Sequence, residues 1–451
     1  MARLLSMAAG AALAALALAG PAAAQTPATP PVAAPPGAGG TGALLRPIVN
    51  LAPVTRTPTT PEEDALARQR FAAQMDAGRS GRGLEAYDPL EAVPGAPDWT
   101  PLPRATPAER TISDAALKAA EAYVAPKNST AFIVWRDGKV QASAQFGGRS
   151  DTDPIISRSL AKPMTAAAVG RAIALGNIRS LDQSVSDFVP EWRGDIRREI
   201  KVRHLLSMTS GFLAQDFSPD PEHILNRAYV HPRHTEIIVN EYPVVDRPGT
   251  VYEYNNATSE MVAVLIERAT GRRYAEFIST EVLKPLGAMG GNIWVNRPGG
   301  VAHSGCCLMI PPESWLRLGI LFAQDGVWEG KRLLPRGYVR QMTTGTKQYP
   351  YYGLGVYVAG RYIERRGFAN PARPAPKILH SEPYLARDLF LFDGNGSQVV
   401  YVIPSLKLVV LRTGNPPPRS GPEWDNAAFI NGIIRGVQLK PGERMPQPQP
   451  R

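Results

Sequence analysis

The chain has 451 residues, of which 44% are hydrophobic and 20% are charged, so it can bury a large core and is not a disordered protein. Its 50 basic and 40 acidic residues give a formal charge of +10, but they are spread along the chain without a long run of like charge. This pattern lacks the basic stripe that marks a nucleic-acid-binding surface, and no nucleic-acid partner is expected.

Residues 1–24 are expected to be a secretory signal peptide. Arg3 precedes an apolar stretch, and Ala22 and Ala24 form an Ala-x-Ala cleavage site. We therefore predict cleavage after Ala24 and a periplasmic or secreted mature protein. The alternative is an uncleaved membrane anchor, because the apolar stretch is close to the minimum length that spans a bilayer. No other segment is apolar enough to cross a membrane, so no membrane span is expected after cleavage.

Composition divides the rest of the chain into three parts. Residues 25–105 are predicted to be a Pro- and Ala-rich linker followed by an N-terminal extension with one helix over 61–78. The sequence assigns no role to residues 61–105. Residues 106–440 have the composition of a globular domain without internal repeats, and residues 441–451 form a Pro-rich tail.

Strands are predicted at both ends of the globular domain. A helix over 112–125 is followed by two β-rich runs that flank Asp137-Gly138, a strong hairpin signal. Residues 388–414 read as three further strands, and a last helix is expected within 423–437. We therefore predict an α+β fold, an α/β sandwich whose antiparallel sheet is built from N- and C-terminal strands and flanked by helices, with a mostly helical second subdomain.

A lysine follows a serine by three residues at the head of an alanine-rich stretch, residues 157–173. Lys162 has small or apolar neighbours, so its ammonium would lie beside a packed core, where a charge is costly. Pro163 would fall in the first helical turn, where its missing N–H breaks no helical hydrogen bond. The sequence therefore predicts a helix start at Ser159 or Leu160.

Residues three apart share a helical face, so the Ser159 hydroxyl and the Lys162 amine are expected to meet. A desolvated lysine has a lowered pKa and, when neutral, can take the serine proton. Helix N-termini also favour developing negative charge. Ser-x-x-Lys alone is a weak sign of a catalytic serine and its base. Its position at a helix start makes this interpretation stronger.

The stretch PGTVYEYNNATSEM, from Pro248 to Met261, leads from a Pro-Gly turn into an amphipathic helix. Tyr254 and Asn256 lie just before that helix. A phenol can relay a proton between a serine and a leaving group, and an amide can orient a substrate carbonyl or the lysine. Taken alone, the Tyr-Asn-Asn run is also compatible with an ordinary polar turn.

Together these motifs resemble the serine β-lactamase and penicillin-binding-protein superfamily, in its class C-like branch of esterases, D-amino-acid peptidases and nylon-oligomer hydrolases. The matching pieces, in chain order, are SLAK, IRSLDQSVSDFVPEW, IKVRHLLSMTSGF, PGTVYE with YNN, PLGAMGG, SGCCLMIPPESWLRLGILFAQDGVWEGKRLLP and GNGSQVVYVIP. They cover roughly residues 106–436. Several motifs in one order are far more specific than any single motif.

The resemblance implies a β-lactamase/transpeptidase-like fold and an acyl-enzyme reaction that needs no metal or cofactor. It makes Ser159 the nucleophile and Lys162 its base. Tyr254 would carry the proton to the leaving group and activate the deacylating water, and Asn256 would orient the substrate or Lys162. The oxyanion hole would combine the Ser159 N–H with an N–H that we place near Asn395.

The sequence departs from the family pattern at the third motif. β-Lactamases and D,D-peptidases usually have Lys-Thr-Gly or a His variant on this strand, which attracts a substrate carboxylate. Here Asp393 follows Phe392 at that place and would repel a carboxylate. We therefore expect a small-molecule ester or amide that lacks a carboxylate at this end. The GNGSQ turn, which ends at Gln398, resembles the nylon-oligomer-hydrolase branch.

Cys306 and Cys307 are adjacent, and a bridge between neighbours is expected to strain the backbone. We therefore expect two small apolar side chains in packing rather than a redox pair.

The histidines are expected to be structural. His204 is expected to be a packed side chain or a helix-capping residue. His231 and His234 could be a pair of metal ligands, but no carboxylate or cysteine cluster lies near them in sequence, so a loop-surface position is favoured. His303 and His380 are isolated in sequence. No metal site is expected.

The sequence thus predicts a secreted serine hydrolase that acts through a Ser159 acyl-enzyme. Two alternatives stay open, a β-lactamase or D-alanyl-D-alanine carboxypeptidase, and a non-catalytic protein that binds cell-wall fragments in the same pocket. The exact substrate and the oligomeric state stay open as well.

Overall fold

The computed structural model describes residues 55–80, 87–216, 218–372 and 375–451, and the account below concerns the compact unit that begins at Pro47. The predicted signal peptide, its cleavage site and most of the linker lie outside the described residues. No helix in the described ranges is both long enough and apolar enough to cross a membrane.

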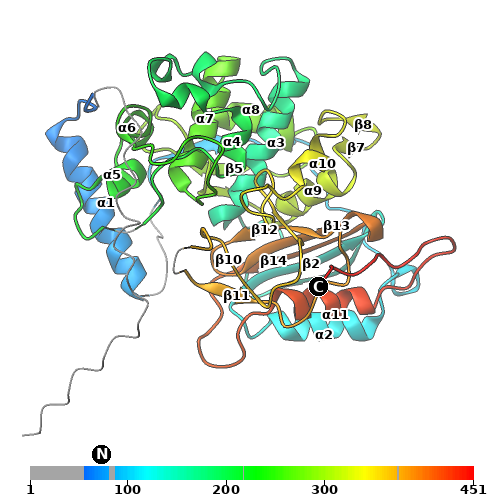
Figure 1. The fold of residues 1–451 in the computed structure, drawn as a ribbon. Coiled ribbons are helices and arrows are strands. Elements are labelled where there is room, and N and C mark those ends of the chain that lie inside the picture. The colour runs from blue at the N-terminus through cyan, green and yellow to red at the C-terminus, as the bar shows by residue number, and fades with distance from the viewer. Residues whose placement is uncertain (1–54, 81–86, 217, 373–374) are drawn as a thin grey trace, which may run out of the picture. The chain divides into compact units, whose positions relative to one another are not determined.

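The main sheet has six antiparallel strands in the order β3-β2-β14-β13-β12-β9 (Figure 1). Its strands are β2 (Ser129–Arg136), β3 (Lys139–Gln145), β9 (Tyr357–Val358), β12 (Phe390–Gly394), β13 (Gln398–Ile403) and β14 (Leu408–Gly414). The N-terminal strand β2 pairs directly with the C-terminal strand β14. The predicted sheet built from both ends of the domain is therefore confirmed.

The predicted hairpin joins β2 to β3. Asp137 and Gly138 have φ of 47° and 94°, the left-handed conformation that a tight two-residue hairpin turn requires. Gly138 adopts it without steric cost, and aspartate tolerates it better than most residues.

Side chains that alternate along each strand divide the core between the two faces of the sheet. Phe132 and Tyr401 pack in one core with α2 (Asp114–Val124) and α11 (Asn426–Arg435), while Ile133 and Val400 pack in the other with α9 (Pro312–Ala323). Figure 1 shows α2 and α11 together on one side of the sheet. The predicted helices near 112–125 and 423–437 are thus confirmed as a covering layer.

The second part of the domain is mostly helical, as expected. Its α-helices are α3 (Ala161–Ala174), α4 (Val202–Leu206), α5 (Ile224–Val230), α6 (His234–Glu241), α7 (Asn256–Thr270), α8 (Tyr274–Ile278) and α10 (Tyr338–Met342). Short turns of helix occur in both parts of the domain: η2 (Pro107–Glu109), η3 (Arg158–Leu160), η4 (Val185–Asp187), η5 (Pro190–Trp192), η6 (Ile196–Glu199), η7 (Ser279–Leu283) and η8 (Pro404–Leu406). The first half of α7 is buried, so this helix forms the centre of the helical part.

Three smaller sheets complete the fold of the residues that the structure describes. One has the order β1-β5-β6-β4, with β1 (Leu90–Val93), β4 (Ile155–Ile156), β5 (Gly291–Trp294) and β6 (Leu308–Ile310). The others pair β7 (Val327–Trp328) with β8 (Lys331–Arg332), and β10 (Arg365–Gly367) with β11 (Lys377–Leu379). Strand β4 ends just before η3, so the first of these sheets helps to hold the turn that contains Ser159.

The N-terminal extension packs on the helical part. Helix α1 (Pro61–Ser80) covers the predicted range 61–78. Arg70 donates from Nη1 to the Asn296 carbonyl at 2.9 Å, and β1 pairs with β5. The extension therefore contributes to the fold in a way that its sequence did not indicate.

The expectation for His231 and His234 is wrong, because both are buried rather than on a loop surface. Helix α1 covers His231, whose Nε2 lies 3.1 Å from Asp64 Oδ1, and His234 lies beside Glu260. His303, which is isolated in sequence, stacks its ring on those of Trp294 and His234.

The prediction for His204 is confirmed. Its Nδ1 accepts a hydrogen bond from the Lys201 N–H at 3.2 Å, at the start of α4.

Candidate active site

Ser159 lies in η3, directly before α3. Arg158 has a φ of 48°, and α3 begins at Ala161, so Pro163 falls in its first turn as predicted. The Ser157 N–H donates to the Leu308 carbonyl at 2.9 Å, and the Leu308 N–H donates to Ser157 Oγ at 3.1 Å. These two bonds tie the turn before Ser159 to strand β6.

The Lys162 amine meets Ser159 as the spacing predicted. Its Nζ donates to Ser159 Oγ at 3.2 Å, and also to Asn256 Oδ1 and to the Gly305 carbonyl, both at 3.0 Å. Lys162 is only 2% exposed. Burial lowers the pKa of Lys162 to about 7, against the opposing effect of the Glu260 charge. A large share of this amine is therefore neutral near pH 7 and can accept a proton.

The Tyr254 ring lies beside the same amine, with its centroid 4.7 Å from Lys162 Nζ. Burial raises the pKa of the Tyr254 phenol, and the Ser159 hydroxyl beside it counters part of that rise. The phenol therefore keeps its proton near pH 7, close to both the serine and the lysine.

The two asparagines that follow Tyr254 have different positions. Asn255 caps α7, since its Oδ1 accepts from the Thr258 N–H at 3.3 Å. Asn256 instead turns its side chain to Lys162, and its N–H donates to Gln215 Oε1 at 2.9 Å. The helix cap thus orients the residue that contacts the lysine.

The turn between β12 and β13 comes close to η3. A Cβ on Gly394 would lie 3.0 Å from the Ser157 carbonyl oxygen and 3.2 Å from the Leu160 nitrogen, so a larger residue would push the two segments apart. Asn395 follows Gly394 and faces the same cavity as Ser159. The structure thus places four of the five predicted site residues, Ser159, Tyr254, Asn256 and Asn395, on the wall of one cavity. The fifth, Lys162, contacts Ser159 and Asn256 from behind that wall.

A buried arginine that sequence reasoning missed holds this turn. Arg412 on β14 is fully buried and donates from Nη1 to the carbonyls of Gly396 and Ser397, at 2.6 and 3.1 Å. Gln398 adds a second tie, donating from Nε2 to the Ile156 carbonyl at 2.9 Å. Both interactions fix the position of Asn395 relative to η3.

Ser159 opens into a cavity of about 960 Å³. Its wall includes Asp393. Burial raises the pKa of Asp393 to about 7, although the Arg366 guanidinium lowers it in part. Arg366 lines the same cavity and donates to the Val358 carbonyl at 2.8 Å. The cavity therefore holds a carboxyl that changes charge near neutral pH and a fixed cation.

The expectation for the cysteines is wrong, because Cys306 and Cys307 form a disulfide. Cys307 has a φ of 69°, and this left-handed backbone accommodates a bridge between neighbours. Both residues line the cavity, and the Tyr229 hydroxyl lies 3.6 Å from Cys306 Sγ. The disulfide thus forms part of the cavity wall.

The N-terminal extension also supplies part of the wall. Gln74 and Met75 reach the cavity from α1, and Tyr87 reaches it from the segment before β1. Nothing local in the sequence signals these contacts, because they depend on where α1 docks.

The family model described as Beta-lactamase matches residues 120–430, more than half of the chain. The chain belongs to the beta-lactamase family. This family member is 27% identical over 229 residues to the 6-aminohexanoate-dimer hydrolase of Paenarthrobacter ureafaciens, a match that covers 48% of the chain and 57% of that protein. It is 29% identical over 133 residues to Penicillin-binding protein 4* of Bacillus subtilis (strain 168), a match over 29% of the chain and 28% of that protein.

The family member thus matches little more than half the length of the first relative, and less of the second. Its fold is similar to that of a Bacillus anthracis protein provisionally described as a 6-aminohexanoate-dimer hydrolase, with a TM-score of 0.58 and 16% identity over 85% of this chain and 97% of that one. The family resemblance and the α+β fold expected from the sequence are therefore confirmed.

Proposed function

We propose that the protein is a serine hydrolase that cleaves a small ester or amide through an acyl-enzyme on Ser159. The observation that carries the proposal is the contact of the buried Lys162 amine with Ser159 Oγ at 3.2 Å. A base that is partly neutral near pH 7 and within hydrogen-bond reach of the nucleophile meets both requirements of general base catalysis.

In the acylation step, Lys162 Nζ takes the proton of Ser159 as Oγ attacks the substrate carbonyl carbon. The resulting oxyanion is held by the N–H groups of Ser159 and Asn395, which together could contribute several kcal/mol, about 3 to 4 for each well-placed donor. Collapse of the tetrahedral intermediate breaks the bond to the leaving group. Tyr254 gives that group its proton and is reprotonated by the Lys162 ammonium.

In the deacylation step, water attacks the acyl carbon. The same pair, Tyr254 and Lys162, takes the water proton and returns a proton to Ser159 Oγ as the ester bond breaks. Asn256 keeps the lysine aimed at Ser159, since it supplies one of the three oxygen atoms that accept hydrogen bonds from Nζ. The cycle consumes one water and regenerates the enzyme.

The substrate class follows from the cavity and from the relatives. Asp393 disfavours a carboxylate near it when ionised, so the proposal favours a substrate that is neutral at that end. The named activity of the Paenarthrobacter relative is the hydrolysis of a 6-aminohexanoate dimer, which supports including amides. The predicted signal peptide places the reaction in the periplasm or outside the cell.

A second candidate is a β-lactamase or D-alanyl-D-alanine carboxypeptidase. One observation favours it: Arg366 lines the cavity and could attract a substrate carboxylate in place of the missing lysine of the third motif. The match to Penicillin-binding protein 4* points the same way.

Intact-mass analysis of the mature protein tests both candidates. The protein is incubated with a fluorophosphonate, a p-nitrophenyl ester or a penicillin, beside Ser159→Ala, Lys162→Ala and, as a matched control, the exposed Ser150→Ala. Adducts from the first two probes that vanish only in Ser159→Ala and Lys162→Ala are expected. A lasting penicillin adduct would favour the second candidate. A folded protein without any adduct would contradict the enzyme and favour a protein that only binds cell-wall fragments.

A further inference from the structure

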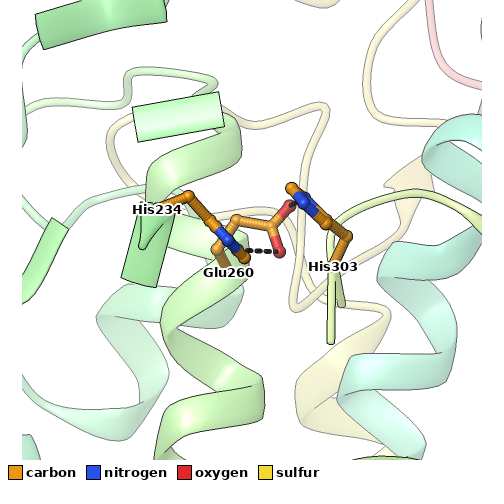
Figure 2. Close-up of side chains that lie close together, drawn as sticks. All are labelled: His234, Glu260 and His303. Carbon is orange, nitrogen blue, oxygen red and sulfur yellow. Dashed lines mark ion pairs between the residues drawn. The ribbon is translucent and has the colours of Figure 1, made fainter. Parts of the chain in front are cut away.

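Three titratable side chains meet behind Lys162, outside the cavity wall. His234 begins α6, Glu260 lies in α7, and His303 lies in the segment between β5 and β6. All three are fully buried. His234 Nε2 lies 3.8 Å from Glu260 Oε2, and His303 Nδ1 lies 3.7 Å from Glu260 Oε1. Figure 2 shows the Glu260 carboxylate beside both imidazoles, with one oxygen towards each ring.

The polar atoms of this cluster lack hydrogen-bond partners among the residues that the structure describes. Both nitrogens of each imidazole and both oxygens of the carboxylate are buried and unpaired. A buried unpaired polar atom costs about 1 to 3 kcal/mol, and native proteins contain few of them. Six such atoms in one place point to a missing partner. A metal ion could bind one nitrogen of each imidazole and the carboxylate at the same time.

The packing around the cluster directs a nitrogen of each ring to the carboxylate. The His303 ring stacks between Trp294 and His234, with centroids 3.9 Å apart on each side and interplanar angles of 7° and 5°. Gly305 closes another side, because a Cβ there would lie 3.0 Å from Glu260 Oε1. One donor atom from each of the three side chains consequently lies within 4.8 Å of the other two.

We infer that His234, Glu260 and His303 bind one divalent transition-metal ion of the zinc type. Two imidazole nitrogens and one carboxylate oxygen are a donor set that zinc uses. Donors that each lie about 2.0 to 2.1 Å from a tetrahedral zinc ion are about 3.4 Å apart. The nitrogen-to-oxygen separations of 3.7 and 3.8 Å exceed this by a few tenths of an ångström, so small shifts and a rotation of the stacked rings would close the site.

The burial of Glu260 gives a further reason for a cation. A carboxylate that is ionised in a fully buried position is costly unless an opposite charge compensates it. A divalent cation held by Glu260 and the two imidazoles would provide that charge.

The ion would link segments that position Lys162. Glu260 lies one helical turn after Asn256 on α7, and His303 lies two residues before Gly305. Asn256 and Gly305 provide two of the three oxygen atoms that accept from Nζ. The metal is therefore structural, and no catalytic step passes through it. The sequence did not suggest it because the three ligands are far apart in the chain.

The test uses Zn²⁺ itself and the full mature chain. The protein is unfolded with a chelator, refolded with either Zn²⁺ or chelator, desalted, and measured for metal content and Tm. We expect one zinc per chain and a Tm higher by at least about 5 °C in the zinc sample. Less than a tenth of an equivalent of zinc, with the same Tm in both samples, would overturn the inference.

Variants locate the metal. Glu260→Gln and His303→Gln are expected to weaken zinc binding at least tenfold. The matched control is His231→Gln, because His231 is equally buried but pairs with Asp64, and it should keep one equivalent. Equal loss in the control would place the metal elsewhere.

If the cluster variants fail to fold, X-ray absorption on the wild-type zinc protein decides. Two imidazoles and an oxygen ligand at about 2.0 Å support the site. Sulfur ligands would assign the zinc to Cys306 and Cys307 and overturn it.

Discussion

The Lys162 Nζ lies 4.7 Å from the centre of the Tyr254 ring while it donates a hydrogen bond to Ser159. The ring face stabilises the ammonium form, whereas burial favours the neutral amine. Because these effects oppose each other, the lysine can gain and lose a proton near neutral pH.

Replacing Lys162 with methionine should remove activity without unfolding the protein. Methionine fills a similar volume without a charge that burial must desolvate, whereas the Gly305 carbonyl and Asn256 Oδ1 lose their donor. Because these effects oppose each other, the Tm should change little. Loss of the general base should lower kcat/KM for a p-nitrophenyl ester by about 10³-fold. Stopped-flow burst kinetics and calorimetry measure the two effects, and a variant that keeps a tenth of the wild-type rate would refute the base assignment.

The pH profile should report the Lys162 amine. Since the neutral amine is the base and its pKa is about 7, kcat/KM should rise with pH around a midpoint near 7. Asn256→Asp places a carboxylate where the amide oxygen accepts from Nζ, which stabilises the ammonium and should move the midpoint up by about one unit or more. The exposed Asn177→Asp is the matched control, and an unmoved midpoint in Asn256→Asp would count against this contact.

Asp393 should control how the enzyme treats anionic substrates. Its carboxyl is ionised above a pH of about 7 and neutral below it. At pH 8, Asp393→Asn should raise kcat/KM for an ester that carries a carboxylate by about tenfold relative to a neutral ester, from the removal of one nearby like charge. At pH 6 the gain should largely vanish. A gain that is equal at both pH values would mean that the charge of Asp393 is not the cause.

The same substitution should alter stability in a pH-dependent way. The folded pKa of Asp393 lies above its unfolded value, so the folded protein holds this proton more tightly, and stability falls as pH rises through about 4 to 7. Asp393→Asn removes this effect. The Tm of the variant relative to wild type should therefore be higher at pH 8 than at pH 5, and a constant difference would contradict the raised pKa.

Arg412 should matter for both stability and rate. Arg412→Met leaves the buried carbonyls of Gly396 and Ser397 without a donor and should cost about 2 to 4 kcal/mol. Because the turn that carries Asn395 loosens, kcat should fall more than KM changes. The exposed Arg435→Met is the control, with an expected cost below about 1 kcal/mol. Denaturant unfolding measures the free energy of unfolding, and steady-state kinetics measure kcat and KM. An unchanged kcat would show that the position of this turn does not affect the reaction.

Local patterns were enough to predict much of this molecule. The Asp137-Gly138 hairpin, the three strands within 388–414 and the helix start near Ser159 each depend on residues within a few positions of one another. The contact between Ser159 and Lys162 is predictable for the same reason.

The features that the sequence missed depend on long-range packing or on backbone conformation. The burial of His231 requires α1, far away in the chain, and the cluster of His234, Glu260 and His303 joins three separate segments. The disulfide between Cys306 and Cys307 depends on a left-handed residue that spacing does not reveal. Asp393 was expected to repel a substrate carboxylate, but burial raises its pKa to about 7, so its charge depends on pH in a way that the sequence does not show.

Helix α1 has a practical consequence for how this protein is studied. The family match begins at residue 120, yet Gln74, Met75 and Tyr87 form part of the cavity wall. A recombinant fragment cut at the family boundary would lack that wall and would admit bulkier molecules than the whole chain does. Substrate screens on such a fragment would report a broader substrate range than the whole chain accepts. The first residue of a recombinant protein therefore affects the specificity that is measured.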